Sequence, residues 1–253
     1  RRPVADAEVA TWLELADDLR AAGNTYEEGL KAALRSILLS PHFLYMVEKA
    51  RPGAGGVVAP LQDHEIATRL SYFFWSTMPD ATLFAAADAG DLAGSETKFA
   101  AEIQRLLSDP KALALTENFV GQWLTLRRLA LDEPDRQPFP MFDARLKDAA
   151  VRETELFFGE LINQNSPIES LLTGEFTFVN PALGHHYGIR VSGTGFERVS
   201  LSTTPRVGIL TQTSFLIANS HPAFTSPTKR GAWVLGQLLC EAPPPPPMEG
   251  AHG

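Results

Sequence analysis

Residues 143–164, DARLKDAAVRETELFFGELINQ, carry the clearest helical pattern in this chain of 253 residues. Asp143 can cap the first turn, because an aspartate oxygen at that position accepts a hydrogen bond from a free backbone N–H group. Apolar side chains then recur at intervals of three or four residues, at Leu146, Ala149, Ala150, Phe157, Phe158, Leu161 and Ile162. This spacing predicts a long helix that buries one face.

Helical patterns also occupy most of the sequence on both sides of this stretch. They predict helices over residues 6–22, 25–38, 62–76, 95–107, 110–126 and 207–219, and a last helix that begins after Ser226-Pro227. Two stretches, 175–179 and 196–201, have the composition of strands and lie in a glycine-rich region. We therefore expect a mainly α protein, a multi-helix bundle in two packed subdomains with a small β-hairpin or irregular insertion near residues 175–201.

Local signals mark where the first helices begin and end. Thr25 and Glu28 fit a capping box, in which each side chain accepts a hydrogen bond from the backbone N–H of the other residue. Pro41 follows Ser40 and should break or kink the helix, because proline lacks an N–H donor and clashes with the preceding turn. These signals predict a helical hairpin at the start of the chain.

Glycine and proline suggest the domain boundaries. The stretch RPGAGGVVAP supports no helical pattern and reads as a linker. Residues 243–247 are all proline, which favours extended polyproline II structure and predicts a second linker, with a frayed tail as the alternative. We expect a helical hairpin (1–50), a linker (51–60), a central helical domain (61–173), a β-containing and C-terminal helical segment (174–242) and a proline-rich tail (243–253).

Composition excludes several classes of partner and site. The formal net charge of −8 makes the chain a poor phosphate binder, so we expect no nucleic-acid partner. No apolar run approaches the roughly 20 residues that a membrane-spanning helix needs. A single cysteine, Cys240, excludes an internal disulfide and a Cys-x-x-Cys pair. Its apolar surroundings predict a buried, inert thiol, with a ligand or a partner for an external disulfide as the alternatives.

The histidines do not form a recognisable metal site. The sequence has six, none at His-Glu-x-x-His spacing, and no thiol cluster could complete a zinc site. We therefore predict no metal centre built by this chain alone. His185 and His186 are adjacent and precede Tyr187 and Gly188. Side chains of neighbouring helical residues point about 100° apart, so one of the two can enter a pocket. A packed histidine at a helix end is the simpler interpretation, and a ligand or acid–base group is the other.

Acidic residues give no catalytic pair by spacing. Glu153 and Glu155 are two residues apart and do not share a helix face. The acidic loop at 132–135 lacks the remaining ligands of an EF-hand calcium site and reads as solvated. A hydrolase that uses Glu153 and a histidine ranks last among the hypotheses, because no nucleophile–base spacing is visible.

One short motif could bind an anion. Ser226, Lys229 and Arg230 place a helix cap beside two cations, which is a possible carboxylate or anion site. A capped helix whose cations pair with nearby carboxylates is the simpler interpretation. The sequence has no phosphate-binding loop, dinucleotide fingerprint or nucleophile elbow.

A series of different short segments occurs along the chain in a characteristic order. In sequence these are Arg1-Arg2-Pro3, Ser40-Pro41-His42-Phe43-Leu44-Tyr45, Glu65 with Arg69-Leu70-Ser71-Tyr72-Phe73-Phe74-Trp75, Pro79-Asp80, Phe119 with Gln122-Trp123-Leu124, Glu153-Thr154, Phe178-Val179-Asn180, His186-Tyr187-Gly188, Arg206 with Gly208-Ile209-Leu210-Thr211, Thr225-Ser226-Pro227 with Arg230-Gly231, and the proline run. The series resembles the bacterial family of uncharacterised domains found in large secreted planctomycete-type cytochrome-c-containing proteins.

The resemblance implies a haem c that is attached outside this sequence, since no Cys-x-x-Cys-His segment is present. It also implies a periplasmic or exported location and a flanking cytochrome c segment, or other subunits of a complex, as partners. The chain would be the helical body of a protein that supports haem-based electron transfer or redox chemistry. The first candidate haem ligand is His186. Further candidates for cofactor binding are His185, Tyr187, His42 and Met46, and the candidates for lining a pocket are Trp75, Trp123 and Tyr187.

The same features fit a second hypothesis that involves no catalysis. Long apolar helices and proline-rich connectors are also expected of an accessory or scaffold subunit in a larger membrane-associated or periplasmic assembly. The sequence leaves both hypotheses open.

Overall fold

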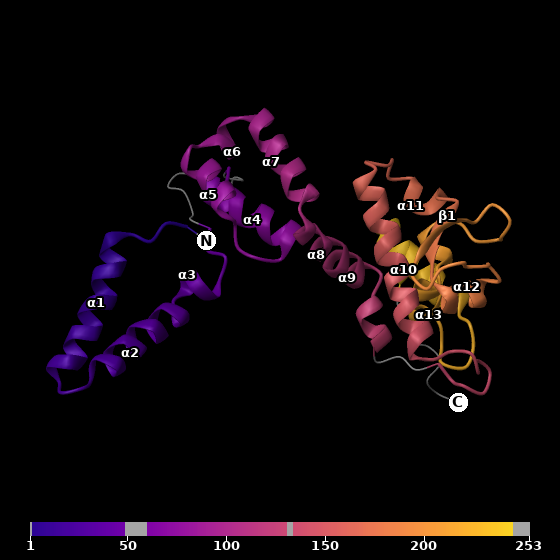
Figure 1. The fold of residues 1–253 in the computed structure, drawn as a ribbon, viewed down its shortest axis with the longest axis horizontal. Helices are drawn as coiled ribbons and strands as arrows, with labels where there is room; N and C mark the ends of the chain where they lie inside the picture. The colour runs from indigo at the N-terminus through magenta and orange to yellow at the C-terminus, as the bar shows by residue number, and fades with distance from the viewer. Residues whose placement is uncertain (1, 49–59, 131–133, 245–253) are drawn as a thin grey trace. The chain divides into compact units, whose positions relative to one another are not determined.

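The computed structural model describes residues 2–48, 60–130 and 134–244. It confirms the mainly helical class and the small β insertion (Figure 1). The chain forms two compact units, Arg1–Lys111 and Ala112–Gly253. The finer division into five ranges stays a prediction. The 51–60 linker, apart from Pro60, and the chain from residue 245 onward lie outside the described residues.

The first unit begins with a helical hairpin. Helices α1 (Asp6–Ala21) and α2 (Tyr26–Leu39) pack against each other, and α3 (Pro41–Leu44) follows. The expected capping box is present, because Thr25 N donates to Glu28 Oε2 over 2.8 Å and Glu28 N donates to Thr25 Oγ1 over 3.3 Å. Ser40 ends α2 and caps α3, so the break predicted at Ser40-Pro41 is confirmed.

The rest of the first unit is a small helical cluster. It consists of α4 (Asp63–Trp75), α5 (Ala81–Asp88), α6 (Asp91–Gly94) and α7 (Glu96–Ser108). Trp75 is buried and its indole N–H donates to the Leu106 carbonyl over 2.9 Å. Arg105 and Lys111 lie over its ring, at 5.5 and 4.6 Å from the centroid. Trp75 is therefore a core residue of this unit.

Gly29 sets the distance between α1 and α2. It is the buried residue of α2, and a Cβ there would lie 2.8 Å from the Ala16 carbonyl oxygen. We expect Gly29→Leu to force the helices apart and to cost about 2 kcal/mol of hairpin stability, because overpacking a close contact costs about 1–3 kcal/mol. Hydrogen exchange of the α1 and α2 amides measures this loss. Arg35→Leu puts the same side chain on the exposed face of α2 and should leave exchange unchanged; equal effects of the two variants would contradict the prediction.

The second unit is built around α10 (Ala144–Asn163), the helix predicted from residues 143–164. Asp143 accepts a hydrogen bond from Leu146 N over 2.8 Å, as its capping role requires. The core beside α10 includes Val120, Phe157, Phe215 and Trp233. The other elements are η1 (Pro110–Ala112), which spans the boundary between the units, and α8 (Leu113–Leu115), η2 (Thr116–Val120), α9 (Gly121–Trp123), η3 (Leu126–Ala130), α11 (Ser170–Thr173), α12 (Pro181–Tyr187), η4 (Ile209–Thr211), α13 (Thr213–Ala218), α14 (Pro227–Trp233) and η5 (Val234–Leu238).

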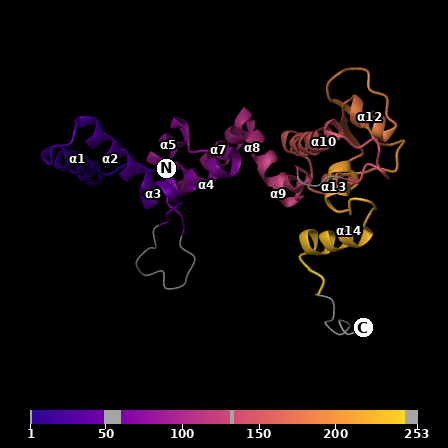
Figure 2. The same ribbon diagram turned by 90° about the horizontal axis from the view of Figure 1, so that it is seen from below.

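Several of the expected helices are interrupted. The stretch expected as one helix over 110–126 is a series of 3₁₀, α and π turns. The stretch over 207–219 is divided at Gln212, whose backbone is extended, into η4 and α13. α13 packs against α10 (Figures 1 and 2). The division turns the start of α13 toward the middle of α10, where the candidate site lies.

A two-stranded antiparallel sheet covers another face of α10. Strands β1 (Phe176–Val179) and β2 (Glu197–Ser200) pair with Thr177 opposite Val199. Side chains alternate along a strand, so Thr177 and Val179 point inward and both are buried. β1 and α12 both contact α10 (Figure 1).

Candidate functional site

A buried carboxylate lies at the centre of the second unit. Glu153 occupies the face of α10 that also carries Leu146, Ala150 and Phe157, and its exposed fraction is 0%. A buried charge is expensive unless hydrogen bonds compensate it. The hydrogen-bond partners of Glu153 therefore decide how its burial is compensated.

Two hydroxyl groups donate to the Glu153 carboxylate. Thr177 Oγ1, from β1, donates to Oε1 over 2.6 Å, and Tyr187 Oη, from the end of α12, donates to Oε2 over 2.7 Å. Tyr187 Oη in turn accepts from Thr213 N and Thr213 Oγ1, each over 2.9 Å. The network thus joins α10, β1, α12 and the start of α13.

Arg206 completes the network on the other side of Tyr187. Its guanidinium carbon lies 4.0 Å from the centroid of the Tyr187 ring, which is within cation–π range. The guanidinium also donates to the Thr211 carbonyl. The Arg206 guanidinium thus lies near enough to Glu153 for its positive charge to act on the carboxylate, without a direct ion pair between them.

The surroundings of Glu153 bring its pKa close to neutral pH. Burial raises the pKa of Glu153 to about 7, while the hydrogen bonds from Thr177 and Tyr187 and the charge of Arg206 act in the opposite direction. Burial, with the charge of Glu153, raises the pKa of Tyr187 above its usual value. Tyr187 is therefore a neutral hydroxyl at neutral pH, and Glu153 is the group whose charge can change.

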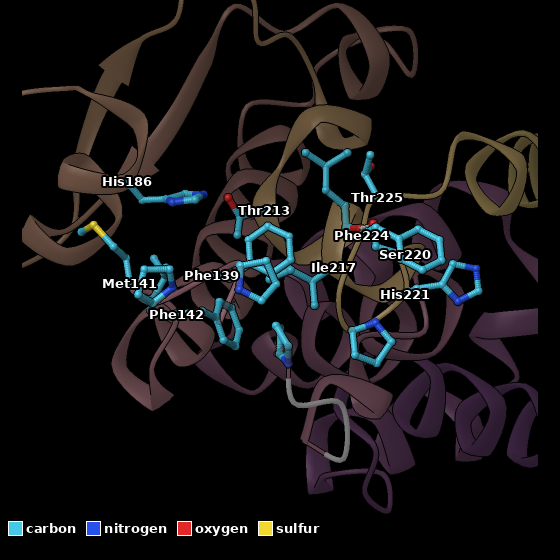
Figure 3. A pocket seen from close by; sticks show the side chains of 16 residues that line it. Phe139, Met141, Phe142, His186, Thr213, Ile217, Ser220, His221, Phe224 and Thr225 are labelled. Atoms are coloured by element: carbon cyan, nitrogen blue, oxygen red, sulfur yellow. Dashed lines mark hydrogen bonds between the residues drawn. The ribbon is translucent and has the colours of Figure 1, made fainter. Parts of the chain in front are cut away.

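An apolar pocket with a volume of about 740 Å³ opens beside this network (Figure 3). Its walls come from residues 134–146, from His186 and from residues 213–225, and the Asp135 N–H ties the two loops by donating to the Pro222 carbonyl over 2.9 Å. Aromatic and proline side chains dominate the lining. It consists of Pro134, Pro138, Phe139, Pro140, Met141, Phe142, Leu146, His186, Thr213, Leu216, Ile217, Ser220, His221, Pro222, Phe224 and Thr225.

Thr213 belongs to both the pocket and the network. In Figure 3, His186 lies on the left of the pocket and His221 on the right, with Thr213 and Ile217 between them. Partial burial, together with the charges of Arg206 and His185, lowers the pKa of His186. Its imidazole is therefore neutral at neutral pH, which is the form that binds metals.

The sequence candidates fall into two groups in the structure. His185 and His186 are both exposed, but only His186 lines the pocket, and the Tyr187 hydroxyl donates to Glu153. His42 and Met46 are exposed in the first unit, outside the pocket lining. The two tryptophans expected in a pocket do not line it: Trp75 is core of the first unit, and Trp123 packs against Trp233.

The candidate anion site has its cations engaged. Ser226 caps the Lys229 N–H, Lys229 Nζ donates to the Ser220 carbonyl over 3.1 Å, and an Arg230 guanidinium nitrogen donates to Thr225 Oγ1 over 2.6 Å. Anion binding there stays a prediction. The expectation of a buried Cys240 is wrong: the residue is exposed and has a φ of 55°, because helical structure ends before it.

Neither the network nor the pocket was predicted from the sequence. Glu153 interrupts the apolar stripe of α10, and that position was a readable sign of a buried carboxylate. Thr177, Thr213 and Arg206 gave no comparable signal, because each comes from a different segment. The pocket residues lie in a proline-rich loop and in a second loop after α13, which only the tertiary structure brings together.

The residues present suit one side of a haem but not its covalent attachment. An apolar wall with a neutral imidazole has the chemistry that a haem edge and its iron require. The chain contains no Cys-x-x-Cys-His, and no group of three or more histidine, cysteine, aspartate or glutamate side chains in the described ranges could hold a metal ion. No helix within those ranges is long and apolar enough to span a membrane.

The protein is mainly helical, and its sequence matches three models of planctomycete-type domains of unknown function, one of which carries a cytochrome-associated name. Residues 61–189 match the family described as PSD4, protein of unknown function (DUF1592), and the chain belongs to this family. Residues 1–48 match PSD5, protein of unknown function (DUF1595), and residues 206–252 match PSCyt3, protein of unknown function (DUF1588). The resemblance inferred from the sequence is therefore confirmed. Searches of curated proteins and of solved structures each find no match.

Proposed function

We propose that this chain is the helical body of an exported c-type cytochrome-associated protein. It supports haem-based electron transfer or redox chemistry, with the haem carried by flanking sequence. The observation that carries the proposal is the neutral imidazole of His186 on the wall of an apolar pocket. The match of residues 206–252 to PSCyt3 supports the cytochrome association.

In this proposal the pocket residues bind and shield the edge of the haem. A haem supplies reversible one-electron chemistry when bound. His186 would offer a neutral nitrogen to hold the iron, and the phenylalanine and proline side chains of the lining would exclude water. Low polarity around a haem tunes its reduction potential, so the lining itself has a role in the chemistry.

We expect His186→Ala to change the absorption spectrum of the naturally produced, haem-bearing protein. If His186 holds the iron, its loss would change the ligand field of the iron, so the Soret band should shift and lose intensity. Absorption spectroscopy with intact-mass analysis measures both the haem content and the shift. His185→Ala is the matched control, because His185 is also an exposed histidine on the same helix but does not line the pocket.

An unchanged spectrum for His186→Ala, or equal shifts for both variants, would remove His186 from the haem site. That outcome would favour the second candidate function, a non-catalytic accessory or scaffold subunit. A specific feature supports this candidate: Tyr26, Leu30, Leu34 and Leu38 follow each other at four-residue intervals on α2, and all four are exposed. An apolar stripe of this kind is typical of a surface that another polypeptide covers.

A further inference from the structure

We propose that the pocket of the second unit binds a neutral aromatic molecule with a phenol-type hydroxyl, and that Glu153 accepts the proton of this hydroxyl through Tyr187 and Thr213. This assignment gives the same pocket an occupant other than a haem edge, and it requires no haem. It rests on the hydrogen-bond network, on the lining of the pocket and on the one residue that belongs to both, Thr213.

The direction of the hydrogen bonds follows from the number of protons on each group. A carboxylate has no proton to donate, so Tyr187 must donate to Glu153. Tyr187 then has no second proton, so Thr213 Oγ1 must donate to Tyr187. Thr213 Oγ1 keeps lone pairs that can accept from a donor in the pocket. The hydroxyl protons of Thr213 and Tyr187 are therefore both directed along the network toward Glu153.

The pocket favours an aromatic and uncharged occupant. Its volume of about 740 Å³ lies in the range of small-molecule sites, about 300–1,000 Å³. Phe139, Phe142 and Phe224 offer ring faces and edges, and aromatic pairs add favourable contacts beyond burial alone. A charged ligand would lose its hydration in this lining without a described ion-pair partner there. A phenol-type hydroxyl stays neutral until a base takes its proton.

The Glu153 carboxylate, at the end of this series of hydrogen bonds, can act as that base near neutral pH. Burial raises the pKa of Glu153 to about 7, so both protonation states are accessible. The titratable or charged groups that face it are Tyr187 from α12 and Arg206 from the segment before η4. β1 and α13 contribute the uncharged Thr177 and Thr213 to the network.

The proton transfer balances without an electron donor or acceptor. The ligand O–H bond breaks and its proton joins Thr213 Oγ1, which passes its own proton to Tyr187 Oη. Tyr187 passes its proton to Glu153 Oε2. The negative charge moves from Glu153 to the ligand oxygen, and the two intermediate hydroxyls are again neutral.

The test uses β-naphthol, an aromatic alcohol whose excited state is a much stronger acid than its ground state. When an acceptor is within reach, the excited probe loses its proton and emits as the naphtholate. With the full chain we expect naphtholate emission from the bound probe above pH 7, halved near pH 7 as Glu153 becomes protonated. Emission from the neutral form at pH 8 would overturn the proposal.

Isosteric variants separate the relay from the pocket. Thr213→Val, Tyr187→Phe and Glu153→Gln should each reduce the naphtholate emission at least tenfold. Thr177→Val removes a hydroxyl from the same carboxylate but not from the relay, so its emission should persist with the midpoint moved to higher pH. Equal emission from Tyr187→Phe and the parent would show another acceptor and overturn the relay.

A last variant tests the location of the probe. Ile217→Trp fills the pocket and should abolish naphtholate emission from the bound probe. Circular dichroism checks that this variant keeps the fold. Failure of β-naphthol to bind at millimolar concentration, or binding that is unaffected by this variant, would overturn the pocket assignment. None of these outcomes depends on the haem proposal, which the spectrum of the His186 variant tests separately.

Discussion

Replacing Gly208 by alanine is expected to lower the free energy of unfolding of the second unit by about 4 kcal/mol. Gly208 has φ and ψ of 57° and −174°, a region that residues with a Cβ essentially avoid. A Cβ there would collide with the Leu172 carbonyl group and would lie 2.6 Å from the Leu171 carbonyl oxygen. Backbone strain of about 1–3 kcal/mol and overpacking of a similar size combine at this position.

The matched control is Gly231→Ala in α14. A Cβ at Gly231 meets nothing within 4 Å, so alanine should gain up to about 1 kcal/mol of helix propensity. Urea unfolding followed by tryptophan fluorescence compares the two variants, because Trp123 and Trp233 both lie in the second unit. Gly208→Ala within about 1 kcal/mol of the parent would contradict the close approach of residue 208 to the α11 backbone.

The second large effect is a pH dependence of stability that originates at Glu153. Its pKa is about 7 in the folded chain against an ordinary value of 4.5, so the folded state binds more protons between these values. The contribution of Glu153 to the free energy of unfolding therefore falls as pH rises from about 4.5 to 7. At 1.36 kcal/mol for each pKa unit, the loss is about 3 kcal/mol.

Glu153→Gln removes the ionisation and keeps the shape of the side chain. The difference in unfolding free energy, variant minus parent, should increase by about 3 kcal/mol between pH 4 and pH 8. Urea titrations at the two pH values measure it. Glu155→Gln is the control on the same helix, since Glu155 instead forms an ion pair with Arg152 over 2.9 Å. A difference that stays constant with pH would show that Glu153 titrates at its ordinary value.

Local hydrogen bonds and apolar spacing were enough to predict most helices. The capping box of Thr25 and Glu28 and the cap at Asp143 involve residues three positions apart, so their partners are visible in the sequence. The stripe from Leu146 to Leu161 likewise predicts α10 and its buried face. Where backbone geometry depends on distant contacts, prediction failed: Gly208 closes against α11, and the helix expected over 207–219 is divided at Gln212.

The helical class, the main helix ends and the family can be predicted without a structure, because each depends on residues that are close together in the chain or on their order. Tertiary structure alone decided the site. Glu153 meets Thr177 across 24 positions and Tyr187 across 34, and Tyr187 meets Thr213 across a further 26. No local spacing selects these partners. A buried carboxylate is stabilised by any hydroxyl that the packing of β1, α12 and α13 brings within hydrogen-bond distance.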